Sequence, residues 1–208
     1  MLVKEFMTVN PVTVEPQTPI NDALYIMRKK NIRRLPLVEH GKLVGIITEG
    51  DLREVSPSPA TTLSVWELNY VLSKTTVNNF AHKKVVTVDP DSTIESAALL
   101  MRQNKIGGLP VVEGDQLVGI ITGVDILDAF IDIMGFKYPG ERVVIQVEDK
   151  VGVLNDVAST VKAEGANITS LAMYHKTPGY AQFVMRLDTK GSNQVINKLQ
   201  EKGYQVNK

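Results

Sequence analysis

Hydrophobic residues follow the same order twice along the first part of the chain. An apolar run with a fixed polar ending, LVGIIT-x-x-D, spans residues 43–51 and returns at residues 117–125, an offset of 74 positions (117 − 43). At this offset about half of the residues from position 12 to position 51 are identical to their counterparts, and no gap is needed. Two copies are too few for a solenoid, so the repeat predicts a paired, pseudo-symmetric module.

Each copy predicts the element order β-α-β-β-α. Apolar residues spaced i, i+3, i+4 and i+7 form a helical stripe at Ile20, Ala23, Leu24 and Met27. The predicted helices cover residues 19–30 and 93–104, with Thr18 and Ser92 as candidate N-caps. Extended runs that end at turn residues predict strands at 11–14, 35–39 and 43–48, and at 85–88, 109–113 and 117–122. A last helix is expected to begin near Asp51 and near Asp125.

The pattern changes on both sides of the second copy. Between the copies, the Ser64-to-Glu67 stretch has a capping-box pattern that predicts a short helix reaching about Leu72, with Trp66 as its anchor. After the second copy, strand and helix periods alternate as βαββαβ, with strands at 143–147, 168–174 and 180–187. One helix is expected from about Leu154, with Gly165 as its C-terminal stop, and another at 193–202. Gly203 begins a last short strand.

The predicted fold class is therefore α/β (α+β). It comprises a first repeat at 1–55, a connector with a short helix at 56–79, a second repeat at 80–134, a linker at 135–141 and a ferredoxin-like domain at 142–208.

Composition narrows the functional classes. The 208 residues include 23 basic and 23 acidic ones, so net charge favours neither a nucleic acid nor a membrane as partner. The chain has no cysteine, which excludes disulfides and thiolate chemistry. With no signal peptide pattern and no apolar run of about 18 residues, we expect a cytoplasmic location.

The repeated T-x-x-D ending carries the candidate chemistry. A threonine hydroxyl and free amides at the start of a helix suit a phosphate. The aspartate two or three residues later can accept hydrogen bonds from the two hydroxyls of a ribose. The alternative is that Thr48 with Asp51, and Thr122 with Asp125, only cap their helices.

These motifs, together with x-x-V-T-V-x-P and h-P-V-V (h, hydrophobic), resemble a tandem pair of CBS domains, the Bateman module, over about residues 1–134. The resemblance implies a sensor that binds AMP, ADP, ATP, NAD or S-adenosylmethionine as effector, with no obligatory cofactor. It implies that Thr48 and Thr122 contact phosphate and that Asp51 and Asp125 hold ribose. The backbone near Val12, Thr13, Val86 and Thr87 would face the base, and the cleft wall would include Pro36 and Pro110.

The two copies differ in charge. Arg33 and Arg34 stand where the second copy has Gly107 and Gly108, and Arg53 stands opposite Leu127. An arginine cluster would favour a polyphosphate in one cleft, or it is a set of solvated surface residues. Because each cleft of such a module draws on both copies, the sequence does not assign Arg34 and Arg53 to one of them.

The C-terminal pattern, R-V-V-I-Q-V-E-D-K-V-G-V-L-N-D-V-A, resembles an ACT domain over about residues 142–206. The resemblance implies a homodimer with a small effector at its interface, and the matching positions are Asp149, Gly152, Leu154 and Asn155. A plain strand-to-helix turn is the alternative. The domain order resembles the acetoin utilisation protein AcuB group, which implies a link to acetoin catabolism.

Three functions remain open. No nucleotide-binding P-loop, Rossmann or zinc-protease motif occurs, and His40, His82 and His175 are scattered, so we predict no catalytic residues and no metal site. The first hypothesis is a non-catalytic regulatory sensor that acts on a protein partner. The second is a structural or dimerisation subunit without a nucleotide response. The third is a nucleotide hydrolase that depends on Asp51 and Asp125.

Overall fold

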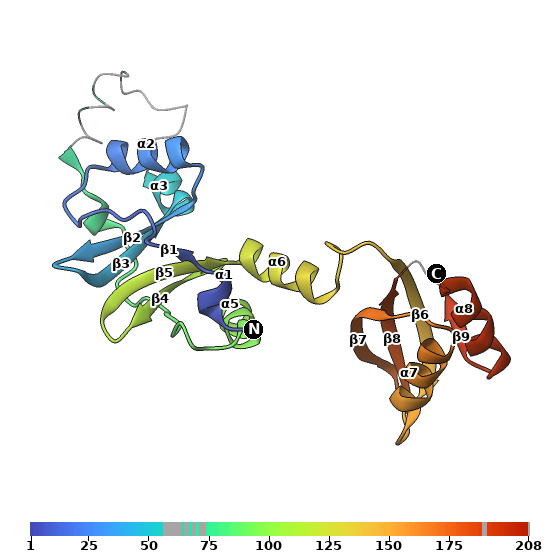
Figure 1. Ribbon diagram of the computed structural model, residues 1–208. Coiled ribbons are helices and arrows are strands. Elements are labelled where there is room, and N and C mark those ends of the chain that lie inside the picture. Colours follow the sequence, from blue (N-terminus) through green and yellow to red (C-terminus); the bar gives the residue numbers. More distant parts are fainter. Residues whose placement is uncertain (56–63, 65–66, 68–69, 71–73, 189–190, 208) are drawn as a thin grey trace. The chain divides into compact units, whose positions relative to one another are not determined.

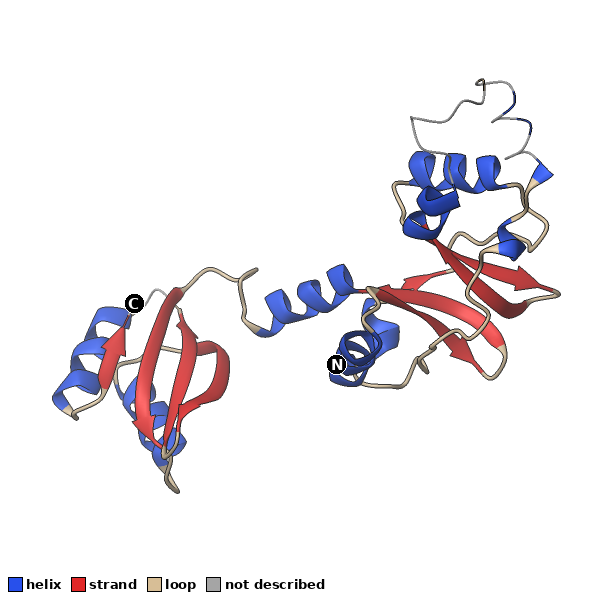
Figure 2. Cartoon of the chain, turned by 180° about the vertical axis from the view of Figure 1, so that it is seen from behind, coloured by secondary structure: helices blue, strands red, loops and turns tan. Residues whose placement is uncertain are grey.

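The computed structural model describes residues 1–55, 64, 67, 70, 74–188 and 191–207. Its contacts divide the chain into two compact units, Met1–Ile126 and Leu127–Lys208 (Figure 1). One sheet belongs to each unit, and helices accompany both sheets (Figure 2). The predicted mixed α/β class is confirmed.

The core elements of both repeats form where the hydrophobic pattern predicts them. The first repeat contains α2 (Ile20–Lys30), β2 (Arg34–Glu39), β3 (Lys42–Thr48) and α3 (Glu49–Val55). The second contains α5 (Ile94–Asn104), β4 (Gly108–Glu113), β5 (Gln116–Thr122) and α6 (Gly123–Ile133). Helices α3 and α6 begin two residues before the predicted start, so Asp51 and Asp125 lie in their first turns.

The first predicted strand of each repeat is wrong. Residues 11–14 and 85–88 make only single parallel bridges, Val14 to Leu37 and Val88 to Val111. The facing strands contain Pro36 and Pro110, which have no N–H to donate, so a longer ladder cannot form along this edge.

The predicted N-caps are also wrong by one residue. Pro19 and Thr93 hold the N-cap positions instead of Thr18 and Ser92. Pro19 makes no side-chain cap, whereas the Thr93 hydroxyl accepts a hydrogen bond from the Ser96 amide at 3.1 Å. The extended backbone therefore continues one residue further before each helix begins.

The two repeats exchange their leading segments. Strand β1 (Thr8–Val9) pairs with β5 of the second repeat, and the preceding helix α1 (Val3–Phe6) donates backbone hydrogen bonds to the carbonyls of Ser92 and Pro90 (Figure 1). Conversely, η1 (Val77–Asn79) bonds to the carbonyls of Thr18 and Pro16, and His82 pairs with Ile46 in β3. Both halves of the exchange obey the 74-residue offset.

The exchange explains the glycine in both LVGIIT runs. A Cβ at Gly45 would lie 3.2 Å from the His82 carbonyl oxygen, and one at Gly119 would lie 3.2 Å from the Thr8 carbonyl oxygen. The crossing segment needs this close backbone approach, which a side chain would obstruct.

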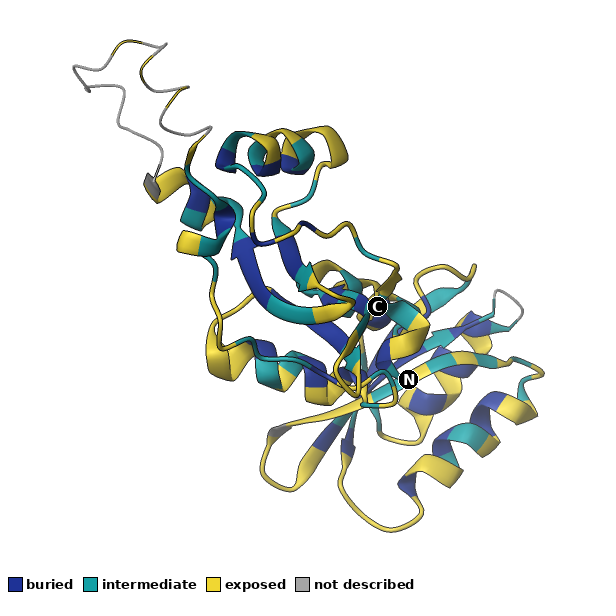
Figure 3. Cartoon of the chain, turned by 90° about the vertical axis from the view of Figure 1, so that its left-hand side faces the viewer, coloured by how far each residue is buried: buried dark blue, intermediate teal, exposed yellow. Residues whose placement is uncertain are grey.

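Each repeat buries an apolar core beneath the crossing segment. Val3 and Val77, which are equivalent by the repeat, are both fully buried. The strands β2 to β5 bury most of their middle residues and each exposes one end, as the burial colours of Figure 3 show. The core of the first repeat contains Val14, Ile20, Ala23, Met27, Leu35, Leu37, Ile47, Leu52 and Val77. The two sheet halves meet where Lys42 pairs with Gln116.

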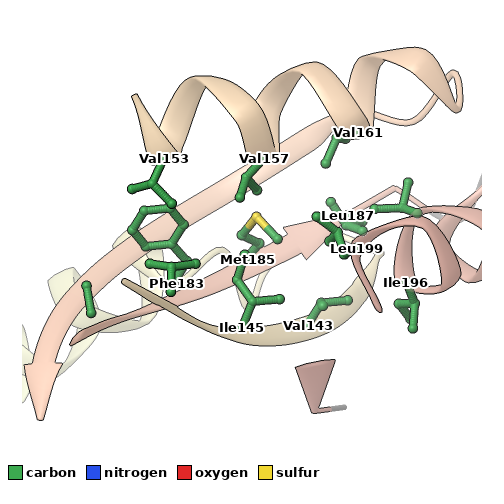
Figure 4. Close-up of a cluster of buried hydrophobic side chains, with 13 residues drawn as sticks. Val143, Ile145, Val153, Val157, Val161, Phe183, Met185, Leu187, Ile196 and Leu199 are labelled. Atoms are coloured by element: carbon green, nitrogen blue, oxygen red, sulfur yellow. The ribbon is translucent and has the colours of Figure 1, made fainter. Parts of the chain in front are cut away.

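The C-terminal unit confirms the predicted βαββαβ order. It contains β6 (Glu141–Glu148), α7 (Val153–Ala163), β7 (Ile168–Thr177), β8 (Tyr180–Leu187), α8 (Ser192–Glu201) and β9 (Gln205–Asn207). The strand order is β7-β8-β6-β9, and α7 and α8 bury their apolar faces in one core around Phe183 and Met185 (Figure 4).

The predicted connector helix lies mostly outside the described residues, and so does Trp66. Its capping box is present: the Ser64 amide donates to the Glu67 carboxylate at 2.8 Å, and the Glu67 amide donates to the Ser64 hydroxyl at 3.3 Å.

Candidate functional site

Both T-x-x-D endings form local hydrogen-bonded caps. The Thr48 amide and hydroxyl donate to Asp51 Oδ2 at 2.8 and 2.7 Å, and the Asp51 amide donates back to the hydroxyl at 3.3 Å. In the second repeat, the Thr122 amide and hydroxyl donate to Asp125 Oδ2 at 2.6 and 2.7 Å. The capping role left open by the sequence is therefore real. It uses only Oδ2 of each carboxylate.

The second oxygen distinguishes the two aspartates. Asp51 Oδ1 lies 3.0 Å from His82 Nε2, because the exchanged segment brings His82 onto β3. The residue equivalent to His82 is Thr8, and Asp125 Oδ1 has no hydrogen-bond partner among the described residues. Burial alone would raise the pKa of Asp51, but the hydrogen bonds from Thr48 and His82 outweigh it and the pKa is lowered.

A cleft of about 490 Å³ lies between the two repeats. The first repeat contributes Arg33, Arg34, Ile46, Thr48, Glu49 and Gly50. The second contributes His82, Lys84, Val85, Val86, Lys105, Ile106, Gly107, Gly108 and Pro110. Apolar walls with a few converging polar groups are typical of small-molecule sites.

The Arg34 side chain extends from the first repeat and packs against Gly107 and Gly108 of the second repeat. A Cβ at Gly107 would collide with the Arg34 guanidinium, and one at Gly108 would lie 3.3 Å from Arg34 Nε. The difference between the repeats at these positions therefore has a structural reason: Gly107 and Gly108 leave the space that the Arg34 side chain occupies.

The Arg34 side chain is half-buried and forms no hydrogen bond or ion pair with any described residue. Burial, followed by the charge of Arg33, lowers the pKa of its guanidinium. A partly desolvated cation without a counter-charge favours binding of an anion.

The cleft as a whole is basic. Arg33, Arg34, Lys84 and Lys105 line it, whereas among the described residues Glu49 is the only carboxylate of the lining and is paired with Arg53 at 2.8 Å. The positions equivalent to Lys84 and Lys105 are Asn10 and Asn31, so the symmetry-related position has fewer charges. Sequence reasoning missed both lysines, although the departure of the repeats from identity at these positions was the available signal.

The predicted nucleotide-binding residues separate into two symmetric sets. Thr48, Val86, Pro110 and Arg34 line the cleft. By the 74-residue offset, Thr48, Val86 and Pro110 are equivalent to Thr122, Val12 and Pro36, respectively. These three equivalents lie at the symmetry-related position. Those that do not line this cleft are Val12, Thr13, Pro36, Asp51, Arg53, Thr87, Thr122 and Asp125. Asp51 nevertheless lies next to the cleft, because it contacts His82, which lines it. The prediction did not include His82.

A second hollow, of about 570 Å³, lies between α2 and α3. It contains Arg53, and it shares Arg33 and Glu49 with the cleft. Sequence reasoning grouped Arg53 with Arg33 and Arg34 but missed Arg28, which also lines this hollow.

Of the predicted ACT effector residues, Asp149 and Gly152 lie on an exposed turn between β6 and α7, and Leu154 and Asn155 lie in the first turn of α7. Gly152 has φ 88° and is the N-cap of α7, so its backbone conformation alone accounts for the glycine. Asp149 Oδ2 lies 3.0 Å from His175 Nε2, and Leu154 and Asn155 are exposed. Effector binding at these four residues stays a prediction.

The described part of the chain shows neither a metal-binding cluster nor a membrane-spanning helix. No group of three or more histidines and carboxylates there is arranged to hold a metal ion. No helix among those residues combines the length and apolar character needed to cross a membrane.

Comparisons with known proteins agree with this geometry. The CBS domain model matches residues 3–58 and 77–132, and the TTHA0829-like ACT domain model matches residues 139–208. Among curated relatives, inosine-5'-monophosphate dehydrogenase of Aquifex aeolicus is 34% identical, over 58% of this chain and 23% of the enzyme.

Three solved structures are similar to the CBS part. The CBS pair of protein MJ0100, in complex with 5'-methylthioadenosine and S-adenosylmethionine, is 32% identical with a TM-score of 0.53, over 66% of this chain and 98% of that one. CBSX2 in complex with AMP is 29% identical with a TM-score of 0.53, over 64% and 97%. The acetoin utilization protein AcuB from Vibrio cholerae is 31% identical with a TM-score of 0.54, over 66% and 95%. The chain therefore belongs to the CBS-domain family and carries a tandem CBS pair followed by a TTHA0829-like ACT domain.

Proposed function

We propose that the chain is a non-catalytic sensor that binds an adenosyl ligand in the cleft between its CBS repeats. The observation that carries this proposal is the unpaired, half-buried Arg34 on the wall of a cleft that also presents Thr48 and Pro110. Similar CBS pairs with S-adenosylmethionine, 5'-methylthioadenosine or AMP support the adenosyl class. The enzyme relative matches this chain over less than a quarter of its own length, which supports a role without catalysis.

The charge of the cleft favours an adenine nucleotide over S-adenosylmethionine. Four basic residues and one paired carboxylate line it, so a phosphate is attracted and a sulfonium cation is repelled. In this arrangement Arg34 and Thr48 hold phosphate, and Val86 and Pro110 flank the base. Asp51 receives ribose after His82 moves away.

The direct test is calorimetric titration of the full chain with AMP, ATP and S-adenosylmethionine. Arg34→Gly copies the second repeat, and we expect it to weaken nucleotide binding at least about tenfold, since one charge-assisted contact is lost. Arg102→Gly, at an exposed position outside the cleft, is the control. A folded preparation that bound no adenosyl compound at millimolar concentration, or that preferred S-adenosylmethionine, would refute the proposal.

The alternative is a dimerisation scaffold with no nucleotide response. It is favoured by the caps, which give Thr48 and Asp51 a structural role. Helix α6 also exposes apolar side chains, with Leu127 60% and Phe130 55% accessible, which supports a homodimer. A role in acetoin catabolism rests on the likeness to AcuB, and an effector at the ACT turn rests on the ACT match.

A further inference from the structure

The hollow between α2 and α3 is a basic groove next to the nucleotide cleft. Arg28, Arg33 and Arg53 line it, and Glu49 is the one carboxylate that the described residues contribute. Its apolar side is formed by Leu24 and Ile32, which pack on the core of the first repeat. The groove therefore has an apolar floor that packs on the core, and its described lining contains three arginines and one carboxylate.

The fold does not require these charges. In the second repeat, Arg33, Glu49 and Arg53 are replaced by Gly107, Gly123 and Leu127, whereas only Arg28 is matched, by Arg102. Helices α5 and α6 form without the cluster. Arg33 and Arg53 are therefore a property of the first repeat alone.

Most of this positive charge has no counter-charge. The side chains of Arg28 and Arg33 make no hydrogen bond or ion pair with any described residue, and only Arg53 is paired, with Glu49 at 2.8 Å. Guanidinium groups arranged in this way bind phosphate oxygens through paired N–H donors.

The groove and the cleft adjoin each other. Arg33 and Glu49 line both, and the Glu49 amide donates a hydrogen bond to the Arg33 carbonyl at 2.9 Å, which fixes the junction. A chain of phosphates that starts beside Arg34 would pass Arg33 and reach Arg53.

We infer that the α2–α3 groove is a subsite for the distal phosphates, so that the ligand is a nucleoside triphosphate or a longer polyphosphate and not a monophosphate. This inference rests on the proposed function. The Glu49 carboxylate lies where the groove meets the cleft and repels an incoming phosphate. The ion pair with Arg53 neutralises Glu49 until a phosphate replaces Glu49 as the partner of Arg53.

The test compares ATP with AMP by titration calorimetry on the full chain, in buffer with EDTA so that no divalent cation masks the phosphates. We expect ATP to bind at least about tenfold more tightly than AMP. Arg53→Leu, which copies Leu127, and Arg28→Ala should each remove most of this advantage and leave AMP affinity within about twofold. Glu49→Gln should strengthen ATP binding more than AMP binding, because Glu49 lines both hollows.

Arg102→Ala is the matched control, because Arg102 occupies the same position on α5 as Arg28 on α2. It should change neither affinity. Equal binding of AMP and ATP by the wild type, equal losses for both ligands in Arg53→Leu, or an effect of Arg102→Ala as large as that of Arg28→Ala would overturn the subsite alone. Failure of both nucleotides to bind would refute the proposed function, and the subsite with it.

Discussion

Asp51→Asn separates ribose binding from helix capping. An asparagine keeps one side-chain oxygen for the Thr48 amide and hydroxyl, which lie 2.8 and 2.7 Å from Asp51 Oδ2. We therefore expect a loss of at most about 1 kcal/mol in the free energy of unfolding. For a chain of this size, that corresponds to a melting temperature lowered by roughly 2–4 °C.

Ligand binding should suffer much more. A ribose hydroxyl that donates to a carboxylate loses a charge-assisted hydrogen bond, which contributes roughly 1.5–3 kcal/mol. The dissociation constant for AMP should therefore rise roughly 10- to 150-fold. Titration calorimetry measures this constant, and thermal unfolding without ligand measures the capping cost separately.

The matched control is Asp125→Asn. Asp125 caps α6 with the same two hydrogen bonds, but the cleft draws its T-x-x-D residues from the first repeat. The control should show the same small loss of stability and less than about a twofold change in affinity. If both substitutions weakened AMP binding equally, or if Asp51→Asn left it unchanged, the assignment of ribose to Asp51 would be refuted.

Four further outcomes are expected. His82→Thr, which copies Thr8, removes the hydrogen-bond contact with Asp51 and should change stability by about 1 kcal/mol or less. It should tighten AMP binding, because the carboxylate no longer has a competing partner; unchanged affinity in calorimetry would contradict this. Because the pKa of folded Asp51 lies below its ordinary value of 3.8, its charge stabilises the fold fully above about pH 4, and this contribution is lost as the pH falls through the lowered pKa. The difference in melting temperature between wild type and Asp51→Asn should therefore shrink as the pH falls below about 4. Phe183→Ala, at a side chain only 1% exposed, should destabilise the ACT unit by roughly 3–5 kcal/mol, seen as faster hydrogen exchange in β6 and β8 but not in β3. If α6 joins two copies of the chain, Leu127→Asp should convert a dimer to a monomer in light scattering, whereas a wild-type monomer would exclude the homodimer.

Local pattern and the internal repeat were sufficient to predict most elements. The stripe from Ile20 to Met27 and the LVGIIT runs fixed helices and strands to within about two residues, because burial of one face governs both. The ACT order followed from the same periods.

Features that depend on distant partners were not predictable in this way. Strand β1 has two residues, too few for any period, and its partner lies more than a hundred positions away. The contrast between Arg34 and Gly107 was visible as a difference between the repeats, but only the fold shows that the arginine rests on the glycines. The role of His82 depends on the same exchange, since nothing near it in sequence indicates Asp51.

The exchanged leading segments impose an order on folding during synthesis. Thr8 emerges from the ribosome 112 residues ahead of its partner Ile120, which at about 5–20 residues per second is a delay of roughly 6–22 seconds. During that interval the core of the first repeat is completed only after η1 has been synthesised. The segment that carries Val3 has no sheet to pair with until the second repeat follows. Deleting the first nine residues should therefore destabilise the second repeat. In the nascent chain this N-terminal segment stays unpaired until β5 has been synthesised, and a chaperone could protect it.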